Sequence, residues 1–172
     1  MKKIIILLLF FVTYTTVLGQ SENTSVFVMN LADDAFESKT TIKKDELSID
    51  KINYMTEQNE VVILAYESIY PLEYINNLEE EALTDLLKSV NEEGFQKLNE
   101  LIGAMPENPT EKNIKFKNAS ETIQTTAKAN GMNFESTTLR SQNNFLQIIF
   151  LGEVKSKEAQ DFMSQLEIIV VE

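Results

Sequence analysis

The chain of 172 residues contains no cysteine, no histidine and no tryptophan. Without cysteine and histidine it lacks the usual ligands of zinc, copper and iron–sulfur sites. It also lacks cysteine nucleophiles and the histidine bases of the common hydrolase triads. Because no disulfide bond can form, hydrophobic packing has to hold the fold together. These absences predict a protein with no metal site and no cofactor.

Glycine and arginine are scarce as well. The chain has five glycines and contains no Walker loop, dinucleotide fingerprint or Gly-x-Ser-x-Gly elbow. Arg140 is the only arginine, so no cluster of guanidinium groups is available to clamp phosphates. The formal net charge of -12 repels nucleic acid and anionic membrane surfaces. We therefore expect no nucleic-acid partner, and we interpret the charge as an aid to solubility, with attraction to a basic partner as the alternative.

The first residues have the layout of an export signal. Lys2 and Lys3 precede an unbroken apolar run, Ile4–Val12, and a small-residue exit ends at Gly19. The run is about half of the roughly 20 residues needed to cross a bilayer, which favours a cleaved signal over an anchor. A lipoprotein is excluded because there is no cysteine to carry the lipid. We expect removal of residues 1–19 and a periplasmic or secreted protein without stable membrane insertion.

The remaining residues, 20–172, suit a single domain with its own core. Their first half is rich in β-branched and aromatic residues, which favour strands. The last of these strands is apolar at six successive positions, as is typical of a central strand covered on both faces. The expected strands are Val26–Leu31, Thr40–Lys43, Leu47–Tyr54 and Val61–Tyr66.

A long amphipathic helix is expected next. Apolar residues recur at helical spacing from Leu78 to Val90, and glutamates fill the opposite face. The pattern continues to Ile102, with Gly94 as a weak point, and two prolines beyond it stop the helix.

The second half predicts a meander of strands followed by a short helix. Asn130-Gly131 suits a type I′ turn because both residues tolerate positive φ. Ser156 is a suitable N-cap for a helix that turns Phe162 inward. The expected strands are Asn113–Lys117, Glu121–Ala129, Met132–Leu139 and Asn144–Leu151, with Ile168–Val171 as a last strand at the sheet edge. Together these elements predict an α+β fold, in which an antiparallel β-sheet packs with one long and one short α-helix.

The C-terminal half also resembles a known superfamily. A polar turn at Asn143-Asn144 introduces an apolar strand that ends at Gly152, and a short helix carrying Phe162 leads into the last strand. This pattern is similar to that of the PsbP/Mog1/DcrB-like superfamily. The resemblance implies an α/β/α sandwich and an accessory or protein-binding role in the bacterial cell envelope, rather than catalysis.

Acidic and basic side chains offer few catalytic arrangements. Asp33, Asp34 and Glu37 lie in an expected loop, where carboxylates suit calcium, but no Asp-x-Asp-x-Asp-Gly loop exists and a solvated acidic turn is the better interpretation. Composition leaves a serine–lysine hydrolase open. A lysine base has to be desolvated, however, and Lys39 and Lys43 fall in an expected exposed strand. We therefore predict no enzyme and no catalytic residues.

The tyrosines suggest a contact surface. Tyr54, Tyr66, Tyr70 and Tyr74 are the candidates to line a groove between the sheet and the long helix, since tyrosine has an apolar body and a polar tip. The alternative is ordinary packing at the sheet margin. Two functions stay open: a protein-binding module, which an exposed apolar patch favours, and a small-molecule or lipid carrier, which an enclosed cavity favours.

Overall fold

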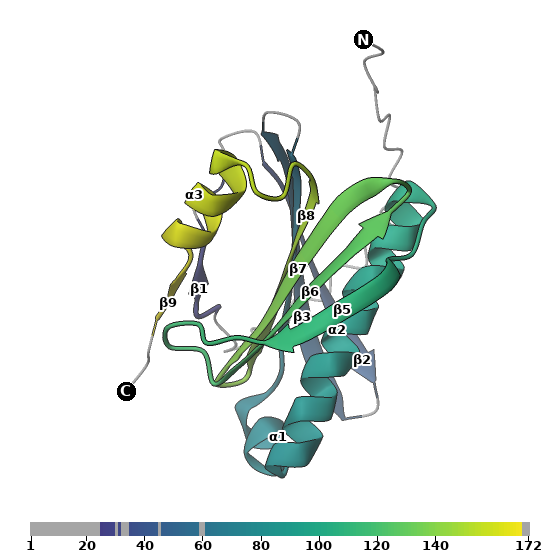
Figure 1. Cartoon of the computed structure of the whole chain (residues 1–172). Helices are drawn as coiled ribbons and strands as arrows, with labels where there is room; N and C mark the ends of the chain where they lie inside the picture. Colours follow the sequence, from purple (N-terminus) through teal and green to yellow (C-terminus); the bar gives the residue numbers. More distant parts are fainter. Residues whose placement is uncertain (1–24, 30, 32–34, 45, 59–60, 170–172) are drawn as a thin grey trace.

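The computed structural model describes residues 25–29, 31, 35–44, 46–58 and 61–169. The expected export signal and the Asp33-Asp34 pair therefore lie outside the described residues. Within those ranges the chain forms a seven-stranded antiparallel sheet with helices against it (Figure 1). The prediction of a single α+β domain, with one long and one short helix on an antiparallel sheet, is confirmed.

The strand order in the sheet is β2-β3-β4-β8-β7-β6-β5, so β8 is central and β2 and β5 are the edges. The consecutive strands β2, β3 and β4 are antiparallel neighbours in the sheet, as are β6, β7 and β8, while the long connection from β4 to β5 carries two helices. The strand bounds are β2 Phe36–Lys44, β3 Leu47–Gln58, β4 Val61–Ile69, β5 Glu107–Asn113, β6 Glu121–Ala129, β7 Met132–Ser141 and β8 Asn144–Gly152.

The sheet is covered on both faces. Helices α1 (Leu72–Asn76) and α2 (Glu80–Ile102) cover one face, which we call the α2 face. The other carries helix α3 (Lys157–Gln165) and a small two-stranded ribbon of β1 (Phe27–Val28) and β9 (Glu167–Ile168), and we call it the ribbon face. The central strand β8 is buried along both faces because each meets an apolar layer.

Helix α2 is continuous through Gly94 and ends at Gly103, whose φ of 69° lies in the left-handed region that glycine adopts readily. Glu80 and Glu81 in its first turn suit the positive end of the helix dipole. Glu80 also pairs with Arg140 of β7, with 2.5 Å between the nearest nitrogen and oxygen. Among the described helices, none is long and apolar enough to span a membrane.

Two local predictions are confirmed by backbone geometry. Asn130 and Gly131 have φ values of 50° and 76°, as a type I′ turn between β6 and β7 requires. The hydroxyl oxygen of Ser156 accepts a hydrogen bond from the backbone N–H of Ala159, so this serine caps α3.

Strand β5 lies earlier in the chain than predicted. The sequence suggested a strand at Asn113–Lys117, but the structure places it at Glu107–Asn113, with Pro109 inside it. Proline is tolerated there because β5 is an edge strand and its pairing with β6 is interrupted between Glu107 and Thr110.

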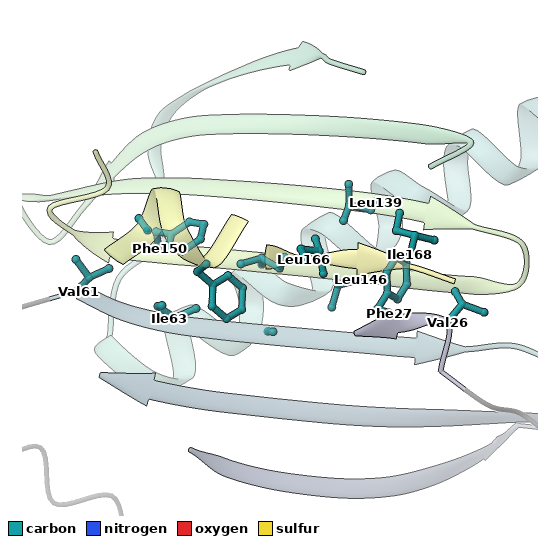
Figure 2. Close-up of a cluster of buried hydrophobic side chains, with 13 residues drawn as sticks. Val26, Phe27, Val61, Ile63, Leu139, Leu146, Phe150, Leu166 and Ile168 are labelled. Atoms are coloured by element: carbon teal, nitrogen blue, oxygen red, sulfur yellow. The ribbon is translucent and has the colours of Figure 1, made fainter. Parts of the chain in front are cut away.

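The prediction that the last strand closes the sheet edge was wrong. β9 pairs with β1 instead, with Phe27 opposite Ile168 and Val28 opposite Glu167. The two-stranded ribbon packs on one face of the seven-stranded sheet and not at its edge. Apolar side chains hold it there, as Figure 2 shows for Val26, Phe27, Leu146 and Ile168. Its two strands are shorter than the expected ones, and residues 170–172 lie outside the described ranges. Helix α1 was not predicted.

Candidate functional site

The four candidate tyrosines do not share one surface. Tyr54 packs against the apolar cluster of the ribbon face, whereas Tyr66 packs against a cluster on the α2 face. The strand register explains this split, because Tyr54 lies opposite Ala65 and successive residues of a strand point to opposite faces. Burial raises the pKa of Tyr54 and of Tyr66 to about 12, so both phenols keep their protons near neutral pH.

Tyr70 and Tyr74 do meet, at the junction of β4 and α1. Their rings are stacked with centroids 6.0 Å apart, and Tyr70 also packs edge-on against Phe145. Tyr70 is buried, while Tyr74 is 38% exposed. An open hollow in the surface lies elsewhere, at the β5 edge. It is lined by Glu107, Asn108, Thr126, Ala127, Lys128 and Asn133.

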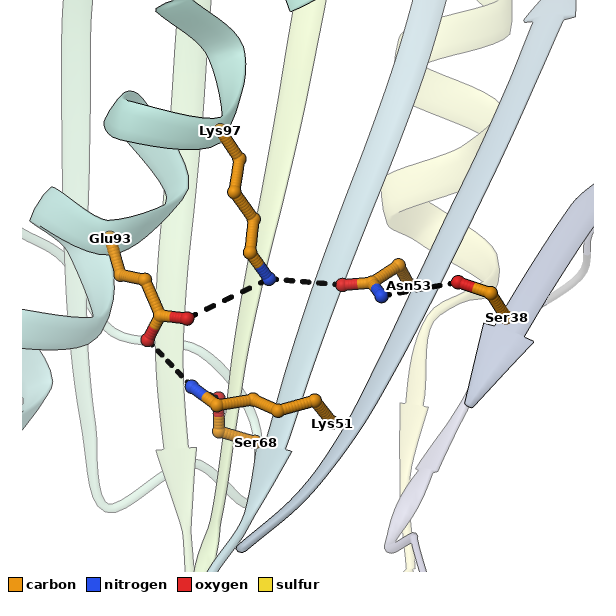
Figure 3. A network of polar contacts seen from close by, with 6 residues as sticks. All are labelled: Ser38, Lys51, Asn53, Ser68, Glu93 and Lys97. Atoms are coloured by element: carbon orange, nitrogen blue, oxygen red, sulfur yellow. Dashed lines mark hydrogen bonds and ion pairs between the residues drawn. The ribbon is translucent and has the colours of Figure 1, made fainter. Parts of the chain in front are cut away.

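A polar network lies between α2 and the first strands of the sheet (Figure 3). Lys51 of β3 and Lys97 of α2 both pair with Glu93, at 2.6 Å and 3.7 Å. Lys97 also donates to Asn53, which donates in turn to Ser38 of the edge strand. The ammonium of Lys97 lies 4.7 Å from the centre of the Tyr66 ring, a cation–π contact.

The electrostatics of this network follow from burial and from opposite charges held close together. Burial favours the protonated form of Glu93, but the hydrogen bond and charge of Lys51, together with Lys97, outweigh it and lower the pKa of that carboxyl. Burial lowers the pKa of Lys97, and the Glu93 carboxylate opposes this effect. The network therefore ties α2 to β2 and β3 through charged groups.

The network contains a serine–lysine contact that sequence spacing could not reveal. Lys51 and Ser68 lie opposite each other on β3 and β4, and the lysine ammonium donates to the serine oxygen at 2.9 Å. Ser68 is only 3% exposed, and the same ammonium is paired with Glu93. A hydroxyl covered in this way cannot meet a polymeric substrate, so the contact is better explained as a structural link beneath α2.

A second polar group divides the core of the α2 face. The buried Gln147 side chain donates to the backbone oxygen and side-chain oxygen of Asn91, both at 3.0 Å, and to Ser136 at 2.9 Å. The hydroxyl group of Thr138 also donates to the side-chain oxygen of Asn91, at 2.7 Å. Apolar clusters lie on either side of this group, one around Phe95 and the other around Leu87, Val90 and Phe145. These contacts fix how α2 sits on the sheet, because buried amides need specific partners.

The two edges of the sheet are protected differently. β5 contains Pro109 and an interruption of its pairing, both of which discourage a further strand from adding. β2 contains neither, and its pairing with β3 is regular over all nine residues. In the described part of the sheet, β2 has a neighbouring strand on one side only. From Glu37 to Lys43 it therefore presents a row of backbone groups with which no other strand of the described sheet pairs.

The side chains of β2 alternate in character. Lys39 and Lys43 are exposed on the ribbon face, where Lys39 pairs with Glu37 at 2.9 Å. Ile42, on the α2 face, is 46% exposed and lies opposite the half-buried Ile49 of β3. This edge thus combines positive charge and exposed apolar surface in an otherwise acidic chain.

Within the described ranges, no group of three or more aspartate and glutamate side chains is placed to hold a metal ion. Comparisons of the chain with protein-family models, curated proteins and solved structures gave no match. Function has therefore to be argued from the geometry of the molecule.

Proposed function

We propose that the protein is an exported, non-enzymatic accessory module of the bacterial cell envelope, which binds an extended, acidic segment of a partner protein along β2. The observation that supports this proposal is the contrast between the two sheet edges. β5 carries proline and an interruption of its pairing with β6, whereas the pairing of β2 with β3 is regular over nine residues. An extended segment can add to such an edge through main-chain hydrogen bonds.

The side chains of β2 indicate the chemistry of the segment. On an added strand, side chains that lie on the ribbon face would be next to Lys39 and Lys43, which are exposed and four positions apart. Opposite charges on neighbouring strands attract and like charges repel. Acidic residues beside Lys39 and Lys43, four positions apart on the partner, therefore fit this face, whereas the exposed Glu37 disfavours an acidic neighbour.

The overall negative charge of the chain does not prevent the binding of an acidic segment at β2. At physiological ionic strength, charges are screened over about 8 Å, so the charged side chains of β2 itself, two lysines and Glu37 on this face, dominate the interaction with an added strand. On the opposite face the segment would lie beside Ile42, whose exposed surface favours an apolar or β-branched residue.

A charge-exchange experiment tests this proposal. The probe is a nine-residue peptide that matches β2 in length, is built of valine and threonine, and carries glutamate at the two positions that would lie beside Lys39 and Lys43. We expect it to bind at least about ten-fold more tightly than a peptide with lysine in place of glutamate. Binding should shift the amide NMR signals of β2 and β3 and should weaken as salt is added.

The Lys39→Glu/Lys43→Glu variant should reverse this preference and favour the lysine peptide. Lys112→Glu, an exposed lysine on the other sheet edge, is the matched control and should leave the preference unchanged. If neither peptide perturbs β2, or if the charge exchange changes nothing, the proposed binding mode is wrong. In that case the lysines act only to protect the edge from aggregation.

A further inference from the structure

A second feature is a buried carboxyl group on β4, beside the apolar cluster that holds the ribbon of β1 and β9. Glu67 of β4 is 1% exposed and lies between Ile52 of β3 and Leu146 of β8 on the ribbon face. Neither of its carboxyl oxygens has a hydrogen-bond partner within the described part of the chain. The Ser25 hydroxyl, next to β1, faces this carboxyl but donates to the Phe27 carbonyl oxygen at 3.1 Å.

A carboxylate in such a place is poorly solvated, so the neutral acid is favoured. Burial raises the pKa of Glu67 to about 7, although the contact with Ser25 and the charge of Lys39 both act to lower it. The shift leaves Glu67 close to half-ionised at neutral pH, whereas an exposed glutamate is already fully ionised there.

Within the described residues, no charged group on this face forms an ion pair with Glu67. Lys39 and Glu37 of β2 pair with each other, and Asp50 of β3 accepts a hydrogen bond from Thr41. Lys43 of β2 is exposed, and Glu135 of β7 accepts a hydrogen bond from Gln124. Other titratable groups lie on β3, β9 and α3. They are Tyr54, which burial keeps protonated, Glu167, which is exposed, and Lys157 and Asp161, which are exposed and form an ion pair. The strand β8 contributes apolar side chains next to Glu67.

The elements around Glu67 differ in how many residue pairs hold them in place. β3 and β8 each pair with β4 over nine positions, whereas β1 and β9 pair with each other over two. Two further hydrogen bonds support the ribbon: the N–H of Ile169 donates to the Val26 oxygen at 2.8 Å, and the Asn118 amide donates to the Ile168 oxygen at 3.2 Å. Short elements with few hydrogen bonds open first in a folded protein.

We propose that Glu67 is a proton-controlled latch: its carboxyl is neutral while the ribbon of β1 and β9 covers it, and loss of the proton lifts the ribbon from the sheet. Lifting lets water reach the carboxylate without breaking the seven-stranded sheet. It also uncovers apolar side chains of the ribbon face, among them Leu139 and Leu146, which the closed ribbon buries (Figure 2). The apolar surface that the molecule presents thus depends on pH.

Hydrogen exchange of the folded, full-length protein tests the latch. The probe is the Ile169 amide, which bonds to Val26 across the ribbon, and its protection is corrected for the intrinsic effect of pH on exchange. The open form has the ordinary acidity of glutamate, and the closed form has a pKa of about 7. We therefore expect protection to fall by roughly 100-fold between about pH 5 and pH 8, while a core amide such as that of Ile148 stays protected.

Two variants remove the ionisation. Glu67→Gln keeps the shape of the side chain and Glu67→Leu keeps its approximate volume, and in both the protection of the Ile169 amide should no longer depend on pH. The control is Glu135→Gln, a half-buried glutamate on the same face, which should behave as the unmodified protein does. The proposal is overturned if the unmodified ribbon shows constant protection, if the Glu67 variants keep the pH dependence, or if Ile148 loses protection in step with Ile169.

Discussion

Gly94 and Gln147 fit each other across the interface between α2 and β8. Glycine in the middle of a helix is normally a weak point, which is what the sequence alone predicts for Gly94. In the structure a Cβ atom at position 94 would lie 1.3 Å from the Gln147 side-chain oxygen. The missing side chain therefore makes room for the buried amide that bonds to Asn91 and Ser136.

This fit predicts that Gly94→Ala destabilises the protein. Alanine favours a helix over glycine by about 1 kcal/mol, but overpacking a well-filled core costs about 1–3 kcal/mol. We expect a net loss of stability, measured by urea denaturation followed by circular dichroism.

A double-mutant cycle separates the clash from other effects of the alanine. In a Gln147→Ala background the obstructing oxygen is gone, so adding Gly94→Ala should be neutral or stabilising. An equal loss in both backgrounds would show that contact with Gln147 is not the reason for the glycine.

Helix α3 illustrates how a single cap positions an element. Ser156 accepts the N–H of Ala159 at 3.2 Å, and the helix turns Phe162 against Phe150 on the ribbon face, with ring centroids 5.9 Å apart. Replacing Ser156 by alanine should lower the free energy of unfolding by about 1 kcal/mol because one helix N–H loses its acceptor.

The control for the cap is Ser164→Ala in the same helix. Ser164 is exposed, and its hydroxyl donates to the Asp161 carbonyl oxygen. Such surface substitutions usually change stability by less than about 0.5 kcal/mol. Thermal unfolding of the two variants compares them directly, and equal losses would argue against a capping role for Ser156.

Elements set by local chemistry were predictable from the sequence. β6 follows from alternating side chains, β8 from a continuous apolar run, and the connection of β6 to β7 from a turn that needs positive φ at Asn130 and Gly131. β5 was misplaced because Pro109 argues against a strand unless it is known to lie at an edge. The pairing of β9 with β1 depends on apolar contacts between segments far apart in the chain, which periodicity does not encode.

The contacts of the candidate site residues were not predictable from the sequence for the same reason. Which face a tyrosine occupies depends on strand register, so the separation of Tyr54 from Tyr66 needed the structure. The contact of Lys51 with Ser68 likewise arises from pairing of β3 with β4. The lysines of β2 were visible in the sequence, but only the strand order shows that they lie on an edge.

For the whole molecule, the buried Glu67 predicts that stability falls as pH rises. Its pKa is about 7 in the folded protein and about 4.5 when exposed, so the folded state binds more protons between these values. The free energy of unfolding should therefore decrease from about pH 4.5 to pH 7, by up to about 3 kcal/mol, and then level off. Ribbon opening limits this loss, because it relieves the carboxylate without unfolding the sheet.

Urea denaturation across this pH range measures the effect. Repulsion among the other carboxylates also changes with pH, so the difference between the unmodified protein and Glu67→Gln isolates the contribution of Glu67. A difference that stays constant from about pH 4.5 to pH 7 would contradict the assignment of a raised pKa to this residue.

The central claim is that β2 receives an extended acidic segment of another protein. The most direct measurement places a photo-crosslinking residue at position 40 or 41 of β2, exposed threonines whose replacement leaves Lys39, Ile42 and Lys43 in place, and at position 110 or 112 of β5, in the full chain produced in its own host. Mass spectrometry then identifies the crosslinked residue in each adduct. We predict a discrete adduct from the β2 positions alone, joined to an extended segment rich in glutamate or aspartate. Equal adducts from both edges, or none from β2, would contradict the account.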